Sequence, residues 1–325
     1  MTTASAVNKS ALPPGRAQAF LKRLQAGEEL AHAMAGTAAG AIFVITALVL
    51  YELITQSTLA RQKFGWHFLF SSTWNPVTGD FGALPFIYGT VVTSILALLI
   101  AVPLGVGAAT FLSELAPAKV SNALTFLIEL LAAVPSVIYG LLGIFVLVPI
   151  LQHSVVPALK AVLGALPIFA GAFYGVSYFS AGIILSVMIL PFIISVSREV
   201  LLSVPRDQRD ASLALGATHW QTTWRVVIPY ASKGIMGSIF LALARALGET
   251  MAVTMVIGNT PQIKASLLAP GYSIAAVIAN EFTEATGDLY LSALIELALV
   301  LFGVTFVLNG LARIMIMATG TKGTH

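Results

Sequence analysis

Six long apolar runs limit what this chain can fold into more than any other feature. Each is close to the roughly 20 residues that a helix needs to cross a bilayer. The runs are Gly36–Ile54, Phe86–Leu112, Phe126–Leu151, Phe179–Val196, Gly234–Ile257 and Leu289–Leu311. Only 10% of the residues are charged, whereas a soluble domain has about 25%. The sequence therefore predicts an all-α polytopic membrane protein with about six transmembrane helices.

The basic residues indicate which parts of the chain face the cytoplasm, because cytoplasmic loops carry an excess of Lys and Arg. With six spans, twelve basic residues fall on the side of the termini: Lys9, Arg16, Lys22, Arg23, Lys119, Arg198, Arg206, Arg209, Arg225, Lys233, Arg313 and Lys322. Four fall on the other side: Arg61, Lys63, Lys160 and Lys264. We therefore expect both termini in the cytoplasm.

The apolar stretch His153–Tyr178 is ambiguous, since Lys160 is its only charge. A seventh span here would move the basic residues after position 200 to the outer side and remove the charge asymmetry. We therefore expect it on the outer face, as a re-entrant or surface-lying segment.

Residues 1–35 form a polar lead before the first apolar run, which does not look like a cleaved signal peptide. Within the lead, Gln18–Met34 mixes apolar and charged residues as an interfacial helix would; a flexible tail is the alternative. Residues 36–55 are then expected to be a retained N-terminal transmembrane helix, and residues 86–316 contain the other five spans.

A cytoplasmic loop is predicted at residues 201–232, between the fourth and fifth runs. Ala211–Leu215 favours a short helix and Gly216 a tight turn. Thr218 is suited to cap a second helix, which Pro229 is expected to end.

Trp220 and Trp224 lie on one face of that second helix. An apolar helix face in the cytoplasm is suited to docking into a groove on another protein. The alternative is that the two tryptophans anchor the loop at the membrane interface.

Several kinds of chemistry are missing from the sequence. It contains no G-x-x-x-x-G-K-[ST] motif, so it has no nucleotide-binding P-loop of its own. It has no cysteine, and its five histidines have no metal-ligand spacing. No catalytic or metal-binding constellation is predicted, and we do not expect an enzyme.

Three ionisable residues fall inside predicted spans. Arg245 lies near the middle of the fifth run and Glu249 four positions later, which would place both on one helix face. Glu296 in the sixth run lies at a similar depth. Because such residues usually mark a substrate path, we expect Arg245 to attract an anion, with Glu249 orienting it. The alternative is an Arg–Glu pair that only joins two helices.

Other classes of function fit the same spans. A secondary transporter or channel would use the three charges as a proton or ion relay, and a membrane scaffold would have no path at all. A docking surface on the loop Asp210–Gly234 would argue against a secondary transporter or channel, which needs no such surface. A buried Arg245 without an exit route would favour the scaffold.

The loop resembles the "EAA" loop of ABC-importer permease subunits. Asp210-Ala211-Ser212 corresponds to the E-A-A triplet and Leu215-Gly216-Ala217 to L-G-A, followed by Ile228-Pro229-Tyr230-Ala231. Asp210 and Ser212 are mild departures from Glu and Ala. In that family the loop couples to a cytoplasmic ATPase. The resemblance implies this role for Asp210, Ala211, Ser212, Leu215, Gly216, Ala217, Trp220 and Pro229.

The fifth run resembles one group within this family more closely than the family as a whole. Ala244–Thr254, with the sequence ARALGETMAVT, is similar to the fifth-helix signature of the phosphate-specific ABC permeases, and Trp74-Asn75-Pro76 and Pro103-Leu104-Gly105 also match. These permeases belong to the family of binding-protein-dependent transport system inner-membrane components. Together the matches cover most of residues 65–315.

The resemblance implies a type I importer fold in a prokaryotic cell membrane. It further implies a heterodimer with a second permease, an ATPase dimer that uses ATP and Mg²⁺, and an extracytoplasmic phosphate-binding protein. No cofactor or nucleic acid is implied for this chain itself. Arg245 and Glu249 match positions linked to phosphate passage. Sulfate and molybdate, which are also tetrahedral oxyanions, remain alternatives.

Overall fold

The computed structural model describes residues 28–164 and 166–319. The predicted interfacial helix lies largely outside these residues, as does most of the polar lead. The chain divides into two compact units, residues 1–55 and 56–325, and each is described by itself.

The described part of the first unit is formed by α2 (Glu28–Gln56). It contains a candidate span, Ala31–Gln56, with a mean hydropathy of 2.1. No residue in the most apolar part of this span is buried within the unit. The predicted first span, Gly36–Ile54, lies within it.

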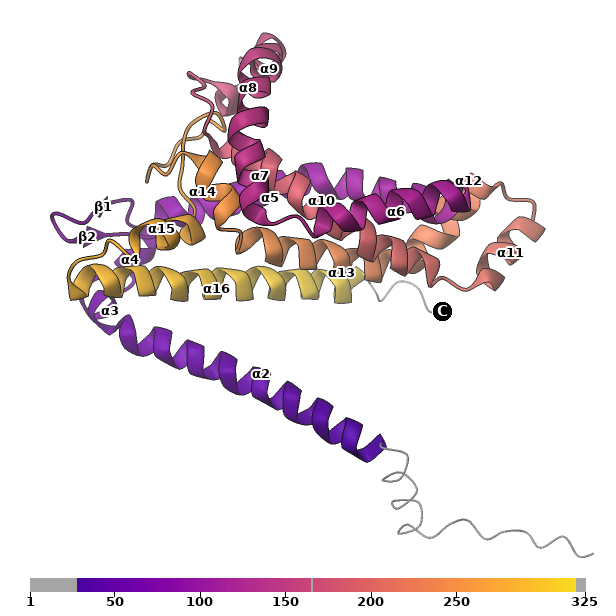
Figure 1. The fold of residues 1–325 in the computed structure, drawn as a ribbon, viewed down its shortest axis with the longest axis horizontal. Helices are drawn as coiled ribbons and strands as arrows, with labels where there is room; N and C mark the ends of the chain where they lie inside the picture. Colours follow the sequence, from indigo (N-terminus) through magenta and orange to yellow (C-terminus); the bar gives the residue numbers. More distant parts are fainter. Residues whose placement is uncertain (1–27, 165, 320–325) are drawn as a thin grey trace, which may run out of the picture. The chain divides into compact units, whose positions relative to one another are not determined.

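The second unit is helical apart from one short hairpin (Figure 1). Its first part contains α3 (Thr58–Phe64), α4 (His67–Phe70), β1 (Trp74–Asn75), β2 (Asp80–Phe81), α5 (Leu84–Thr110) with its π-turn η1 (Phe111–Leu115), and α6 (Ala118–Ala132). Then follow α7 (Ser136–Leu142), η2 (Gly143–Leu147), α8 (Val148–Ile150), η3 (Leu151–Val155), α9 (Val156–Leu163) and η4 (Pro167–Phe169). The last part contains α10 (Tyr178–Leu202), α11 (Arg206–Ala214), α12 (His219–Thr222), η5 (Thr223–Val227), α13 (Ile228–Leu247), α14 (Met251–Ile257), α15 (Ile274–Glu281) and α16 (Asp288–Thr319).

Six helical segments in the described chain are long and apolar enough to span a membrane, as predicted. After the first, they are Leu84–Leu115, Ser136–Val162, Tyr178–Leu202, His219–Leu247 and Asp288–Leu311. The second, fourth and sixth of the six coincide closely with predicted runs. The third and fifth are displaced along the chain.

The third span was predicted wrongly at Phe126–Leu151. The helix breaks between α6 and α7, where Pro135 stands at the N-terminal cap of α7 and restricts the backbone of the residue before it. The span Ser136–Val162 therefore takes in the first third of the stretch that was expected to be re-entrant or surface-lying. Figure 1 shows α7, α8 and α9 forming one helical run at a steep angle to α6.

The core of the second unit lies where α10 packs along α5. Their contact is close because a small residue on each helix receives a large side chain from the other. A Cβ on Gly105 would lie 2.7 Å from Ile193, and one on Gly182 would lie 2.5 Å from Leu96. Small residues allow transmembrane helices to approach in this way. About two thirds of α10 is buried inside the protein, which makes it the central helix.

The two ends of the bundle are built differently (Figure 1). One end carries α11 and α12. The other carries the β1–β2 hairpin, in which Trp74 pairs with Phe81, together with α15. Glu281 on α15 accepts hydrogen bonds from the Trp74 indole at 2.8 Å and the Tyr290 hydroxyl at 2.6 Å, and these bonds hold the hairpin against α16.

Candidate functional site

The fifth run is a broken helix and not the continuous span that the sequence predicted. α13 ends at Leu247, Gly248 leaves the helical conformation with ψ near 2°, and α14 begins at Met251. Glycine is a poor helix former because it loses the most backbone freedom. The Glu249 carboxylate accepts a hydrogen bond from the Ala252 backbone at 3.2 Å, which favours the start of a new helix at this point.

This break separates Arg245 from Glu249, which were expected to lie on one helix face. Arg245 is in the last turn of α13, and Glu249 lies in the break and caps α14. Over the described residues, Arg245 forms no ion pair with a carboxylate. The Arg–Glu pair that was the structural alternative is therefore not formed.

Arg245 instead contacts α10. Its guanidinium carbon lies 5.0 Å from the centre of the Phe192 ring, within the range of a cation–π interaction. Its Nε atom is buried and has no hydrogen-bond partner among the residues that the structure describes. A buried polar group without a partner costs about 1–3 kcal/mol. The side chain thus retains a donor that an anion would satisfy.

Glu296 lies apart from these two residues. It is 8% exposed on α16, with Ser57 hydrogen-bonded to its carboxyl group and Arg61 near enough to interact with its charge. Its neighbours on α16 pack in a different hydrophobic cluster from those of Arg245. No hydrogen bond or ion pair in the described parts of the chain joins it to the other two. The predicted three-residue group is thus not assembled in this structure.

The loop forms the predicted helix, glycine turn and helix. α11 ends in a turn where Gly216 has a φ of +87°, and its amide donates to the Leu213 carbonyl at 2.9 Å. Thr218 caps the next helix in a reciprocal arrangement with Gln221. Gly216 is therefore used for a backbone conformation that other residues rarely adopt.

We predicted that the second helix of the loop ends at Pro229, and this prediction is wrong. It passes through the π-turn η5 and continues as α13, with Pro229 among the first residues of α13. A π-turn shifts the hydrogen-bond register of a helix by one residue, and the missing N–H of a proline is tolerated at such a discontinuity.

Most of the predicted docking residues are on the surface. Asp210, Ala211, Leu215, Gly216, Trp220 and Pro229 are exposed, and Ser212 and Ala217 are half-buried. The Ser212 hydroxyl lies 3.0 Å from the Thr222 hydroxyl and fastens α11 to α12. Trp220 and Trp224 are 57% and 53% exposed, with ring centres 5.6 Å apart. The loop thus presents a fixed apolar surface.

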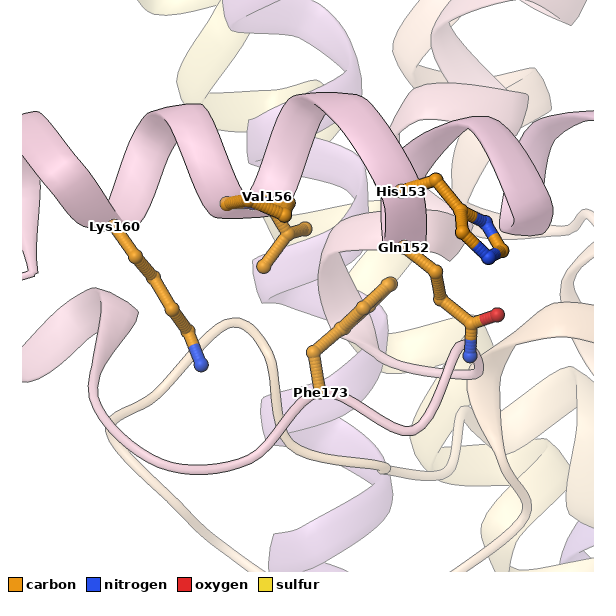
Figure 2. Close-up of a pocket in the computed structure, with 6 residues that line it drawn as sticks. Gln152, His153, Val156, Lys160 and Phe173 are labelled. Carbon is orange, nitrogen blue, oxygen red and sulfur yellow. The ribbon is translucent and has the colours of Figure 1, made fainter.

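A groove beside α9 is lined by polar side chains, two of which contact backbone carbonyls (Figure 2). Its residues include His153, Lys160 and Phe173. The Lys160 ammonium donates to the Gly171 carbonyl at 2.5 Å, and a His153 ring nitrogen lies 2.8 Å from the Pro149 carbonyl. Both contacts join side chains of this region to its own backbone, so we assign the groove a structural role.

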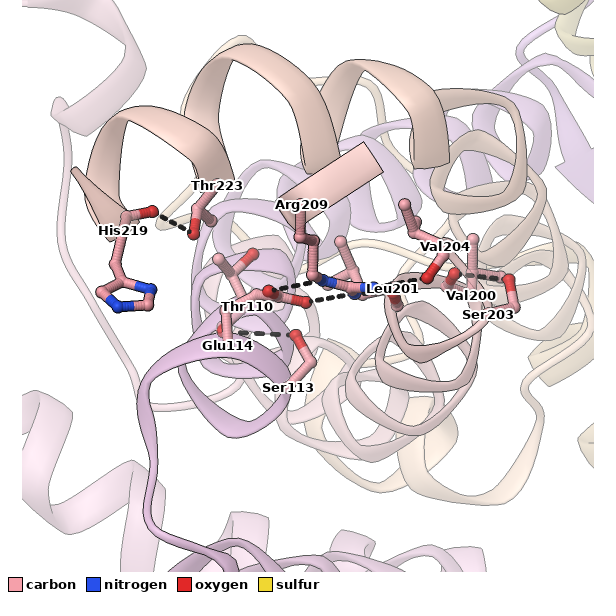
Figure 3. A network of polar contacts seen from close by, with 10 residues as sticks. All are labelled: Thr110, Ser113, Glu114, Val200, Leu201, Ser203, Val204, Arg209, His219 and Thr223. Atoms are coloured by element: carbon pink, nitrogen blue, oxygen red, sulfur yellow. Dashed lines mark hydrogen bonds and ion pairs between the residues drawn. The ribbon is translucent and has the colours of Figure 1, made fainter. Parts of the chain in front are cut away.

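Glu114 was not assigned a role from the sequence, yet its carboxylate forms an ion pair with Arg209 of the loop (Figure 3). Its carboxylate accepts two hydrogen bonds from Arg209, at 2.8 and 3.1 Å. The two residues are 95 positions apart, so no local pattern reveals the pair.

The comparisons with known proteins agree with this architecture. The sequence profile of the family described as "Binding-protein-dependent transport system inner membrane component" matches residues 101–316. A phosphate transport system permease protein, PstC, of Mesorhizobium japonicum is 48% identical over 95% of this chain and 96% of its own length. The PstC of Pasteurella multocida is 46% identical over 86% of this chain and 89% of its own length.

Two solved structures share the fold. A bacterial ABC transporter involved in the import of the polysaccharide alginate has a chain that superposes with a TM-score of 0.52, covering 90% of this chain and 98% of its own at 18% identity. A chain of the MetNI methionine ABC transporter reaches 0.51, covering 76% and 96% at 17% identity. The chain is thus an all-helical multi-pass protein of the inner membrane with the fold of an ABC-importer transmembrane domain, and it belongs to the family of binding-protein-dependent transport system inner membrane components.

Proposed function

We propose that this chain is a permease subunit of an ATP-driven importer that moves inorganic phosphate into the cytoplasm by alternating access. The observation that carries the proposal is the identity of 48% with a phosphate permease over nearly the whole of both chains. Sulfate and molybdate have the same tetrahedral shape, and the experiment below separates them from phosphate.

Arg245 is the residue we propose to meet the anion. An arginine deep in a membrane protein is costly, by about 2.5–3.5 kcal/mol or more, and usually serves a function. Phosphate suits its planar fork of donors, and its buried Nε has no partner within residues 28–164 and 166–319. Glu249, at the break between α13 and α14, would limit how tightly the anion is held, since a carboxylate repels it. Because it lies apart from these two, Glu296 is at most a secondary member of the pathway.

We infer the partners of this chain from the exposed surface of the loop and from the family to which the chain belongs. Residues 201–232 would dock, through the exposed surface of Asp210, Leu215 and Trp220, on an ATPase dimer that binds ATP and Mg²⁺. A second, homologous permease would complete the pathway as a heterodimer. A phosphate-binding protein would deliver the anion at the end that carries β1, β2 and α15. In this arrangement residues 36–55 are an additional N-terminal span and residues 86–316 the permease core.

Competition for uptake tests the substrate. Membrane vesicles carrying this chain with its second permease and ATPase would be supplied with the binding protein, ATP inside and ³²P-labelled phosphate outside. Unlabelled phosphate should abolish uptake of the label, and sulfate or molybdate in the same excess should leave it unchanged. Equal inhibition by sulfate or molybdate would reject phosphate as the specific substrate.

A further inference from the structure

Arg209 joins three elements of the second unit with one side chain. It projects from α11 and gives two hydrogen bonds to Glu114, in the π-turn that ends α5. It also donates to the backbone carbonyl of Leu201, at 2.8 Å, and to that of Val204. Figure 3 shows these contacts converging on the guanidinium. The inner ends of α5 and α10 and the first helix of the loop are thereby held together.

Burial and bidentate geometry strengthen the Glu114–Arg209 ion pair and fix the relative orientation of its two side chains. The side chains of Arg209 and Glu114 are only 19% and 10% exposed, so water screens them little. A bidentate Arg–carboxylate contact also fixes relative orientation, which a single contact does not. The Leu201 and Val204 carbonyls lie at the C-terminal end of α10 and just beyond it, where the helix dipole favours a cation.

The apolar residues below the pair form one cluster that includes Leu112, Leu201, Val204 and Val227. Leu112 lies in η1, Leu201 and Val204 lie at the end of α10 and just beyond it, and Val227 lies in η5, in the second helix of the loop. A packed cluster of this kind transmits displacement because it cannot be compressed. Movement of α11 should therefore carry the ends of α5 and α10 with it.

α10 also connects this end of the bundle to Arg245. The Leu201 carbonyl that binds Arg209 lies nine residues after Phe192, the ring beneath the Arg245 guanidinium. At 1.5 Å per residue the two contacts are about 14 Å apart along one helix. The same rigid helix thus touches the Glu114–Arg209 pair at its end and the candidate anion site in its middle.

We infer that Glu114 and Arg209 are positioning residues that lock the loop to the ends of α5 and α10, so that movement of α11 reaches the helix that supports Arg245. The inference rests on the proposed function, in which an ATPase moves the loop. It assigns the coupling of hydrolysis to transport to two residues that lie outside the exposed docking surface.

A double-mutant cycle tests this inference. Glu114→Gln, Arg209→Gln and the double variant would be prepared in the full complex, and phosphate uptake and ATP hydrolysis would be measured on the same samples. Each single variant should lower the uptake per ATP hydrolysed by roughly fivefold or more, the lower end of the range for coupled sites. The double variant should be no worse than the more severe single variant, since both remove one interaction.

Two controls separate positioning from stability. Arg209→Lys keeps the positive charge but loses the planar guanidinium that forms two parallel hydrogen bonds. It should reduce uptake per ATP as the neutral variants do. Glu199→Gln removes the other ion pair described near the end of α10, whose carboxylate is 71% exposed and bonded to its neighbour Arg198; it should have no effect. Variants that lower the amount of complex while uptake per ATP stays normal would overturn the inference, as would additive effects in the cycle.

Hydrogen exchange gives a readout that does not depend on transport. The amides of residues 206–214 should exchange faster in the Glu114→Gln complex than in the wild type and in the Glu199→Gln control. Unchanged exchange in these amides would overturn the inference. If the wild-type complex takes up no phosphate, the proposed function fails, while the exchange result still decides whether the pair holds the loop.

Discussion

Replacing Gly216 with Val should uncouple the permease without unfolding it. Gly216 has a φ of +87°, a region that costs an L-residue about 1–2 kcal/mol and a β-branched residue the upper part of a range of about 1–3 kcal/mol. A Cβ at this position would meet no atom within 4 Å. The whole cost is therefore backbone strain and not a clash.

That strain is comparable to the energy of the bonds that hold the turn. The Gly216 amide donates to Leu213 at 2.9 Å and the Ala217 amide to Ser212 at 3.2 Å, each contributing about 0.5–1.5 kcal/mol. The variant should therefore relax by opening the turn, which changes the direction of α11 relative to α12. Gly216 and Leu215 are exposed, so the membrane helices should keep their packing.

The assay compares three quantities in one preparation: the amount of variant in the membrane, its thermal unfolding in detergent, and ATP-driven phosphate uptake. We expect the first two near the wild-type values and uptake reduced at least tenfold, as for a loss of about 1.4 kcal/mol of coupling. Gly237→Val is the matched control, because Gly237 also has nothing within 4 Å of a Cβ but has an ordinary helical φ. Full uptake by the Gly216 variant, or an equal loss in the control, would show that coupling does not depend on the backbone conformation of this turn.

Three further predictions concern other parts of the chain. Arg245→Gln should abolish uptake while the complex still assembles, because no carboxylate loses a partner; failure to assemble, seen by size-exclusion chromatography, would show a structural role instead. Trp220→Ala should change the unfolding free energy by less than about 0.5 kcal/mol but weaken ATPase binding by roughly tenfold or more; unchanged affinity in a pull-down titration would exclude this face from docking. Gly89→Ala should destabilise the protein by about 1–3 kcal/mol, because its Cβ would lie 2.0 Å from the Tyr272 carbonyl, whereas Gly107→Ala, with nothing within 4 Å, should be neutral in thermal unfolding.

The number of spans and the design of the loop were predictable from the sequence. Hydrophobic length alone gives six spans, and Gly216 and Thr218 are residue types with narrow structural uses at the end and start of helices. Each of these signals comes from residues that are close together in the sequence, so no knowledge of the tertiary structure is needed to recognise it.

The two helix breaks were not predictable in the same way. Hydrophobicity continues through Gly248 and through Pro135, and a window that sums hydrophobicity does not detect a break inside an apolar run. Just before the fifth run, the sequence predicted a helix that is capped by Thr218 and ends at Pro229, whereas the structure continues this helix into α13. The break at Gly248 is what separates Arg245 from Glu249.

The contacts of the candidate sites depend on tertiary packing. The partners Phe192 of Arg245, Ser57 of Glu296 and Glu114 of Arg209 each come from a distant part of the chain. Apolar periodicity indicates which face of a helix is buried, but it does not indicate which helix covers that face. For this reason a buried charge can be recognised from the sequence, while its partner cannot.

The energy source of transport tests the proposed function most directly. Phosphate uptake would be measured in vesicles that carry this chain with its second permease, ATPase and binding protein, at zero proton gradient, with and without ATP inside. We predict uptake only when ATP is present. Uptake that ignores ATP and appears when a proton gradient is imposed would contradict this prediction, and would identify the charged residues of the spans as a proton relay.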